Sequence, residues 1–349
     1  MLAEKNNACI DTFLEALIRD INRQINVFEV NEIPTVYIGG GSPSVLGNKI
    51  RVLLDALNKI PRFSPVEFTI EANPESLTED FLCACRGGGI NRLSLGVQTF
   101  HQPSRTAVNR GGEPVLIEEK LNIASKYFKD AFSADLIIGL PHQSEQTVMN
   151  DIKKLLEYNT RHISLYGLSI EKDTPLEQKI KTKTVTLPKS ETADNLWLLG
   201  RDTLLASGFE HYEVSNFAKK GGECRHNIRY WQMQSWLGAG PAASGTLVNE
   251  KQASAKRFTF ANDIDAYIKS PCIEDAVFEQ LDKNMLMRES ILMGFRCKDG
   301  PDPVIFRQRF GRTVEECIPK TIEKWKYKDK LLFLNQFLLE AFGELGMRN

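Results

Sequence analysis

The sequence predicts an α/β fold: a partial (β/α) barrel that lacks its first strand, followed by a small, mainly helical domain of winged-helix-like character. Short β-branched segments alternate with helical patterns over the first two thirds of the chain. This alternation implies parallel pairing with right-handed crossovers, which leaves two alternatives, an open doubly wound sheet and a full or partial barrel. Polar residues at the C-terminal ends of several strands favour the barrel, because its ligand face is built there.

The expected elements of the barrel follow the chain in order. An amphipathic helix is expected from about residue 10 to residue 27, where apolar residues recur at helical spacing. Strands are expected at residues 35–38, 67–71, 92–96, 134–138, 163–168 and 211–218. Helices are expected after the first five strands, at residues 44–58, 77–86, 114–128, 144–158 and 190–207. The opening helix has no strand before it, which departs from the barrel rhythm.

The alternation of strands and helices stops after Leu247. The remaining sequence predicts short helices at residues 262–269, 285–295, 303–310, 314–324 and 331–345. We therefore expect a barrel domain over residues 1–247 and a helical domain over residues 248–349.

Composition excludes several classes of protein. The chain has 349 residues, of which 42% are hydrophobic and 26% charged, as in a soluble globular protein. A formal net charge of -1 gives no electrostatic footprint for nucleic acid. No apolar run approaches ~18 residues and no secretory signal is visible, so we expect a cytoplasmic protein without a membrane span; peripheral membrane contact stays open. Seven scattered cysteines are typical of reduced thiols.

Five short motifs carry the functional signal. Three consecutive glycines after the first expected strand leave the main chain uncovered for a ligand, although glycine turns without a ligand are at least as common. The motifs are Ile38-Gly39-Gly40-Gly41-Ser42-Pro43, Glu71-Ala72-Asn73-Pro74, Leu95-Gly96-Val97-Gln98, Asp135-Leu136-Ile137-Ile138-Gly139-Leu140-Pro141 and His226-Asn227-Ile228-Arg229-Tyr230-Trp231. Together they resemble radical S-adenosylmethionine (radical SAM) proteins. The resemblance is to the HemW-type heme chaperones, relatives of oxygen-independent coproporphyrinogen III oxidase.

The resemblance implies a binding site for S-adenosylmethionine. It gives Gly40, Gly41 and Ser42 the role of receiving the amino group of the methionyl part; the usual residue at Ser42 is Thr, and the hydroxyl is kept. The same matching implies that five polar residues contact this ligand: Glu71, Gln98, Arg110, Asp135 and Ser169.

The chemistry of these five side chains suits that ligand. Carboxylates such as Glu71 and Asp135 accept hydrogen bonds from an ammonium group or ribose hydroxyls, and Arg110 pairs with a carboxylate. Gln98 both donates and accepts. The rival interpretation is that each is simply a polar residue that closes a strand, and their common register with the family argues against it.

The resemblance also implies a heme site at His226, Tyr230 and Trp231. A neutral imidazole can ligate heme iron, and aromatic rings can pack on a porphyrin face. If the segment is helical, Tyr230 lies near His226. The rival interpretation is a buried structural histidine. Cys224, two residues before His226, is a further weak candidate as a soft donor.

The family also holds a [4Fe-4S] cluster in an N-terminal C-x3-C-x2-C loop, and these 349 residues contain no such motif. Cys83 and Cys85 cannot replace it, because residues two apart on a helix point to different faces and no third cysteine accompanies them. Ser244 stands where family members commonly carry His. We therefore assign no catalytic residue and no metal ligand.

The function implied is that of a HemW-like heme chaperone, which binds heme and S-adenosylmethionine and delivers heme to acceptor proteins. One alternative is an enzyme similar to oxygen-independent coproporphyrinogen III oxidase, which needs the cluster. Another is a binding protein without a cluster. Whether the chain is an enzyme stays open, as does whether a preceding segment supplies the missing strand and cluster loop.

Overall fold

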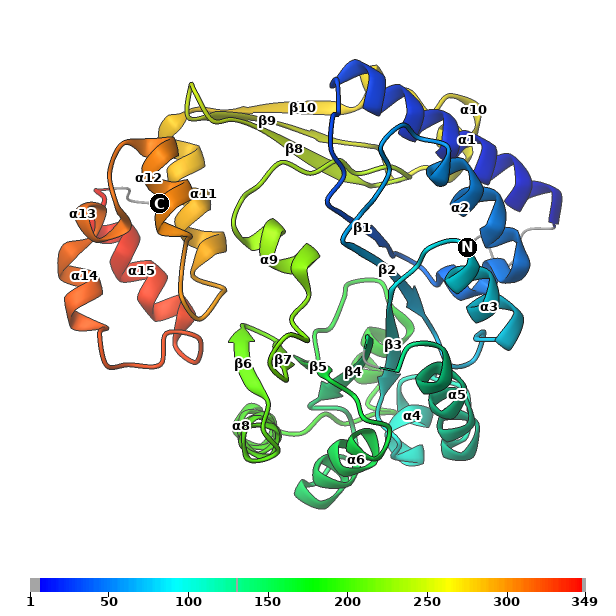
Figure 1. Cartoon of the computed structure of the whole chain (residues 1–349). Coiled ribbons are helices and arrows are strands. Elements are labelled where there is room, and N and C mark those ends of the chain that lie inside the picture. Colours follow the sequence, from blue (N-terminus) through cyan, green and yellow to red (C-terminus); the bar gives the residue numbers. More distant parts are fainter. Residues whose placement is uncertain (1–6, 130, 347–349) are drawn as a thin grey trace. The chain divides into compact units, whose positions relative to one another are not determined.

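The computed structural model describes residues 7–129 and 131–346 of the chain. Contacts divide the protein into two compact units, which Figure 1 shows in the colours of the sequence. Unit 1 comprises Met1–Ile33, Lys59–Phe63 and Cys224–Asn349, and unit 2 comprises Pro34–Asn58 and Ser64–Glu223. The expected division into residues 1–247 and 248–349 follows other boundaries and stays a prediction.

Unit 2 is built on a seven-stranded, mostly parallel sheet with the order β1-β2-β3-β4-β5-β7-β6. Its strands are β1 (Thr35–Ile38), β2 (Glu67–Ala72), β3 (Arg92–Gln98), β4 (Phe132–Ile138), β5 (His162–Gly167), β6 (Glu210–Glu213) and β7 (Asn216–Ala218). Strands β1 to β5 pair in parallel, each with the next along the chain. The α/β partial barrel expected from the sequence is confirmed.

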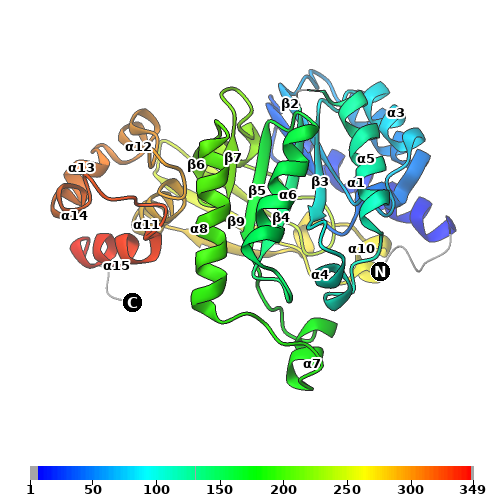
Figure 2. The same cartoon turned by 90° about the horizontal axis from the view of Figure 1, so that it is seen from below.

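Helices connect the parallel strands of unit 2. They are η2 (Pro43–Lys49), α2 (Ile50–Asn58), α3 (Glu79–Gly87), α4 (Gln102–Ala107), α5 (Pro114–Tyr127), α6 (Glu145–Glu157), α7 (Pro175–Lys181) and α8 (Ser190–Ala206). Helix α6 begins where Ser144 and Thr147 form a capping box that satisfies two N–H groups of the first turn. Figure 2 shows α6 and α8 beside strands β4 and β5, with α7 standing apart.

The two faces of this sheet differ in chemistry. One face is apolar and largely buried, as residues such as Ile70, Leu95 and Leu136 show. The alternate residues, which point to the opposite face, are mainly polar on every parallel strand. They include Tyr37, Glu67, Thr69, Glu71, Arg92, Ser94, Ser133, Asp135, His162, Ser164 and Tyr166. The side chains of the sheet that could bind a ligand therefore lie on this polar face.

The single strand expected at residues 211–218 is wrong. Val214 and Ser215 form a turn, so β6 and β7 are a hairpin, in which Glu213 pairs with Asn216. β7 then runs antiparallel to β5. The turn lacks glycine and proline, the usual signals of a hairpin, which is why the pattern looked continuous.

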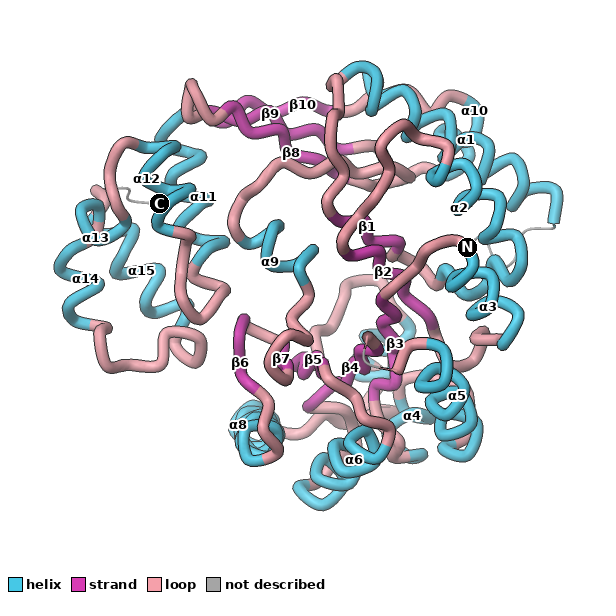
Figure 3. Tube along the Cα trace, in the orientation of Figure 1, coloured by secondary structure: helices cyan, strands magenta, loops and turns pink. Residues whose placement is uncertain are grey.

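Unit 1 combines helices with a second sheet, visible as three strands in Figure 3. The strands β8 (Ser244–Asn249), β9 (Ser254–Thr259) and β10 (Val277–Leu281) form an antiparallel sheet in the order β10-β9-β8. Sequence analysis expected none of them. The helices are α1 (Asn7–Val27), α9 (Arg225–Trp231), α10 (Ile264–Lys269), η3 (Ile273–Asp275), α11 (Lys283–Gly294), α12 (Pro303–Phe310), α13 (Val314–Cys317), α14 (Pro319–Lys324) and α15 (Leu334–Glu344).

Two apolar clusters stabilise unit 1. The larger cluster gathers residues from β8 to β10 and α11 to α15, including Phe295, Trp325 and Phe337. In the smaller cluster, Ala16 of α1 packs with Phe258 and Tyr267. In the part of the chain that the structure describes, no helix combines the length and apolar character needed to cross a bilayer.

Candidate functional site

The turn after β1 is open toward a ligand. Gly40 and Gly41 have φ angles of 82° and 62°, which glycine adopts without strain. A Cβ atom placed on either glycine would meet nothing within 4 Å, so the backbone is uncovered there. At Gly39 an added Cβ would lie 2.8 Å from the Tyr37 ring and 2.9 Å from the Glu71 carboxyl carbon, so only glycine allows this approach.

Glu71, at the end of β2, holds this turn in place. Its carboxylate accepts from the Tyr37 hydroxyl at 2.7 Å and from the Gly40 N–H at 3.1 Å. Each carboxylate oxygen accepts more than one hydrogen bond, so Glu71 keeps capacity for a ligand. The structure therefore brings together two of the predicted positions, Gly40 and Glu71, and gives Glu71 a positioning role that the sequence did not reveal.

Three serine hydroxyls join the first two motifs. Ser42 lies 3.1 Å from Ser44, Ser44 lies 2.6 Å from Ser76, and the N–H of Asn73 donates to Ser44 at 3.1 Å. These contacts tie the glycine turn after β1 to the Glu71-Ala72-Asn73-Pro74 segment after β2. Ser42 is thus fixed beside its neighbouring motif.

Asp135 of β4 lies in a polar band across the sheet. Ser94 of β3 donates to its two carboxylate oxygens at 3.5 and 3.4 Å, and Ser164 of β5 also hydrogen-bonds to it. Burial raises the pKa of Asp135 from 3.8 to about 6, and the Glu71 charge adds to the rise, whereas the serine hydrogen bonds and Arg92 lower it. Asp135 therefore gains its proton at a higher pH than an ordinary aspartate does.

Gln98 is turned into its position by a bulge at the end of β3. The pairing of β3 with β4 shifts register between Leu95 and Gln98, and Gln98 has a φ of 68°. Its amide nitrogen lies above Gly96, where an added Cβ would come within 2.9 Å of it. The glycine in the Leu95-Gly96-Val97-Gln98 motif therefore makes room for the glutamine side chain.

Arg110 and Ser169 are the least constrained of the predicted residues. Both side chains are exposed, in the loops after α4 and after β5. In the described part of the chain, no hydrogen bond joins either side chain to another predicted ligand contact. Their assignment stays a prediction.

Arg105 is a residue of this site that sequence reasoning missed. Its guanidinium is buried and donates to the carbonyl groups of Val97 at 2.9 Å, Thr99 at 3.1 Å and Gly112 at 3.0 Å, and also to Gly111. These bonds fix the end of the Gln98 strand to the loop that carries Arg110. Burial lowers the pKa of Arg105, and the Arg110 charge contributes. Its position inside the short helix α4 gave no motif signal.

The heme candidates His226, Tyr230 and Trp231 lie on α9, so the segment is helical, the condition under which Tyr230 was expected near His226. All three side chains are half-buried. The Tyr230 ring centroid lies 4.2 Å from that of Trp236 and 5.8 Å from that of Trp231. Tyr230 and Trp231 therefore take part in an aromatic cluster of unit 1, while the eight predicted S-adenosylmethionine contacts fall in unit 2.

The residues in hand do not fit an iron–sulfur cluster. Within residues 7–129 and 131–346, no three His, Cys, Asp or Glu side chains come together as metal ligands. Cys83 is exposed and Cys85 is buried on α3. We route no chemical step through a cluster.

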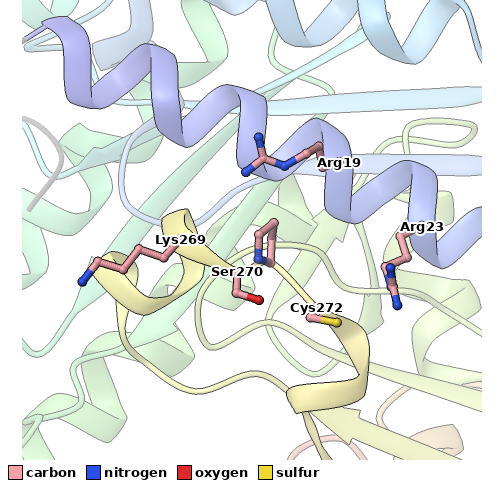
Figure 4. Close-up of a pocket in the computed structure, with 6 residues that line it drawn as sticks. Arg19, Arg23, Lys269, Ser270 and Cys272 are labelled. Atoms are coloured by element: carbon pink, nitrogen blue, oxygen red, sulfur yellow. The ribbon is translucent and has the colours of Figure 1, made fainter.

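A separate cavity of about 370 Å³ lies in unit 1, and none of the predicted site residues lines it. Figure 4 shows Arg19 and Arg23 on α1 facing the segment of Lys269, Ser270 and Cys272. Arg23 forms an ion pair with Glu274. The cavity is basic and open to solvent.

Comparisons with known proteins agree with this geometry. Residues 13–155 match the radical SAM superfamily. The chain is 31% identical to a protein of Lactococcus lactis subsp. lactis (strain IL1403) named heme chaperone HemW, over 92% of this chain and 84% of that protein. It is 32% identical to heme chaperone HemW of Escherichia coli (strain K12), over 68% of this chain and 62% of that protein.

A solved structure shares the fold. Coproporphyrinogen III oxidase (HemN) from Escherichia coli, described as a radical SAM enzyme, superposes with a TM-score of 0.76. The match covers 95% of this chain and 82% of that protein, at 20% sequence identity. At this identity the likeness concerns the fold alone.

Proposed function

This chain belongs to the HemW heme chaperone family, and on that premise we propose that it binds heme and S-adenosylmethionine and passes heme to acceptor proteins. The observation that carries the proposal is the 31% identity to a protein named heme chaperone HemW over 92% of this chain. A cytoplasmic location and heme-acceptor proteins as partners belong to the same proposal.

Heme is the cargo in this proposal, and α9 is its binding element. His226 is the proposed iron ligand, through the nitrogen of its neutral imidazole. Tyr230 and Trp231 pack the side of α9 into the aromatic cluster of unit 1, which fixes the helix that carries His226. Their proposed role toward heme is therefore a limited ring contact together with support of the helix.

S-adenosylmethionine is the proposed ligand of the polar face in unit 2. The uncovered backbone of Gly40 and Gly41 supports this, because a ligand ammonium group can approach carbonyl groups there. Asp135 would accept from ribose hydroxyls or from the ammonium group. When bound to a reduced cluster, this cofactor supplies radicals in the superfamily; here the residues in hand support binding alone.

The S-adenosylmethionine site is tested by equilibrium dialysis with the radiolabelled ligand. Asp135→Ala should weaken binding while the circular dichroism spectrum stays that of the wild type. Since the pKa of Asp135 is about 6, the affinity of the wild type should also fall between pH 7 and pH 5 as the carboxylate gains a proton. Equal affinities of wild type and variant at every pH would remove Asp135 from the site.

Heme delivery is tested by mixing the heme-loaded protein with apomyoglobin. The proposal predicts that the myoglobin Soret band appears faster than from the same amount of heme loaded on serum albumin. A rate no greater than that from albumin would contradict the chaperone function, whereas heme binding alone would remain. The alternative is an enzyme similar to oxygen-independent coproporphyrinogen III oxidase. This chain shares the fold of that enzyme at 20% sequence identity, and a shared fold alone does not indicate a shared activity.

A further inference from the structure

Gln98 lies at the centre of a strained turn. The N–H of Thr99 donates to the carbonyl of Val97 at 2.9 Å, so this hydrogen bond encloses Gln98 alone, and Gln98 has a φ of 68°. A three-residue turn with a positive φ at its centre is rare and strained. A residue other than glycine keeps such a conformation only where its surroundings hold it, and strain of this kind gathers at functional sites.

Asp151 of α6 fixes the two residues that follow Gln98. One carboxylate oxygen accepts from the Thr99 hydroxyl at 2.6 Å, and the other accepts from the Phe100 N–H at 2.9 Å. Asp151 and Thr99 are both buried, so water does not compete for the bond between them. The Thr99 hydroxyl in turn accepts from the N–H of His101 at 3.0 Å. One side chain of α6 thus determines how the main chain leaves the turn.

The main chain on both sides of Gln98 is held, whereas its side chain is not. Arg105 donates to the carbonyl groups of the two flanking residues, Val97 at 2.9 Å and Thr99 at 3.1 Å. Within residues 7–129 and 131–346, the half-buried Gln98 amide makes no hydrogen bond. An amide both donates and accepts, so both capacities of Gln98 are open to a ligand.

The Asp151 carboxylate is unfavourable for folding at this place. Burial raises the pKa of Asp151 from 3.8 to about 6, whereas the hydrogen bonds from Thr99 and Phe100 and the charges of Lys154 and Arg105 lower it. A buried carboxylate opposes folding unless its partners offset the loss of hydration. The strained turn and the buried carboxylate are two unfavourable features that meet at one strand end. Such a combination is expected where geometry matters more than stability.

We propose that Asp151 is a positioning residue of the S-adenosylmethionine site, and that through Thr99 and Phe100 it holds the turn from which Gln98 meets the ligand. The inference rests on the proposed S-adenosylmethionine binding and adds to it a residue that does not itself touch the ligand. Without the Asp151 carboxylate, the strained turn relaxes and the Gln98 amide leaves its place. Loss of Asp151 therefore weakens binding through Gln98 and through no other contact.

The test is a double-mutant cycle of Asp151→Ala and Gln98→Ala, in which binding of radiolabelled S-adenosylmethionine is measured by equilibrium dialysis. Each single variant should bind at least fivefold more weakly than wild type. The double variant should bind at most twofold more weakly than Gln98→Ala, because the turn no longer presents an amide. Urea unfolding separates this from a merely structural role: Asp151→Ala should lower the free energy of unfolding whether or not Gln98 is present.

Thr99→Val repeats the cycle in a variant that keeps the shape of the side chain, so the result does not depend on whether Asp151→Ala folds. It removes the hydroxyl that Asp151 holds, and its effect on binding should also appear only where Gln98 is present. Asn150→Ala is the matched control, because it removes an exposed polar side chain from the same helix. It should bind S-adenosylmethionine as the wild type does.

Three results would overturn the inference. The first is additive losses of affinity in the double variants, and the second is wild-type affinity of both Asp151→Ala and Thr99→Val. The third is wild-type affinity of Gln98→Ala, which would leave the proposed S-adenosylmethionine binding standing. Failure of the wild type to bind S-adenosylmethionine would instead contradict that part of the proposed function itself.

Discussion

Asp135→Asn tests whether the ionised carboxylate of Asp135, on the polar face of the sheet, lowers the stability of the folded protein. Burial raises the pKa of Asp135 from its ordinary value of 3.8 to about 6 in the folded protein. A group with a raised folded-state pKa stabilises the fold when protonated, and this contribution is lost as the pH rises through about 6. With these two pKa values, the free energy of unfolding falls by roughly 1 kcal/mol between pH 5 and pH 8 from this group alone.

The assay is urea unfolding of wild type and Asp135→Asn at several pH values between 5 and 8. Asn cannot titrate, so the stability of the variant relative to wild type should increase by roughly 1 kcal/mol from pH 5 to pH 8. Other acids contribute equally to both proteins and cancel in the difference. Ser94→Ala provides a second arm: it removes a hydrogen bond that lowers the pKa of Asp135, so the loss of stability should move to higher pH. A stability difference that does not change with pH would refute the reasoning.

Three further substitutions test the turn and the loop around the polar face. Gly39→Ala should lower the free energy of unfolding by about 1–3 kcal/mol, because the new Cβ lies 2.8 Å from the Tyr37 ring; an unchanged urea midpoint would contradict this. In Gly41→Ala the new Cβ meets no neighbour, but alanine must adopt a φ of 62°, so a loss of about 1 kcal/mol in the free energy of unfolding is expected from backbone strain. A larger loss in Gly41→Ala than in Gly39→Ala would contradict this reasoning. Arg105→Met should lower the free energy of unfolding by about 3 kcal/mol and speed amide hydrogen exchange at residues 108–113, the loop around Arg110. Exchange at the wild-type rate in this loop would show that Arg105 does not hold the loop in place.

The parallel strands could be predicted because their sequences carry strong local signals. β1 was predicted with its observed bounds, and β2 to β5 within two residues at each end. Each is short and apolar on the face that packs against helices, and most are followed by a helix whose start is marked by Ser, Thr or Pro. The α9 helix was not among the helices expected from the sequence; its helicity was only a condition for placing Tyr230 near His226.

The antiparallel strands of unit 1 could not be predicted in this way. β10 buries only Leu281 of its five residues, and β9 buries only Ala255 and Phe258, so neither has a continuous apolar pattern. Their pairing is a tertiary effect, which local propensity does not report. The turn at Val214 and Ser215 could not be predicted either, because it contains no glycine, proline or aspartate to mark it.

The motif residues of the candidate site could be predicted from the sequence, whereas the residues that hold them in position could not. The sequence pointed to Glu71, near the end of β2, and to Asp135, which lies in the middle of β4 and not at the strand end where it was expected. It did not reveal that Tyr37 holds Glu71, because this contact joins residues 34 positions apart. It also did not reveal that Arg105 fixes the Arg110 loop, because the hydrogen bonds of Arg105 go to main-chain carbonyl groups, which leave no side-chain pattern in the sequence.

The measurement that tests the central claim most directly is a hemin titration of the full chain, followed at the Soret band, for wild type and His226→Ala. Asn227→Ala on the same helix is the control for general damage to α9. The account predicts saturable binding of one heme by wild type and by the control, and a shifted Soret band with at least tenfold weaker binding in His226→Ala. Identical spectra and affinities of wild type and His226→Ala would contradict heme ligation at this helix.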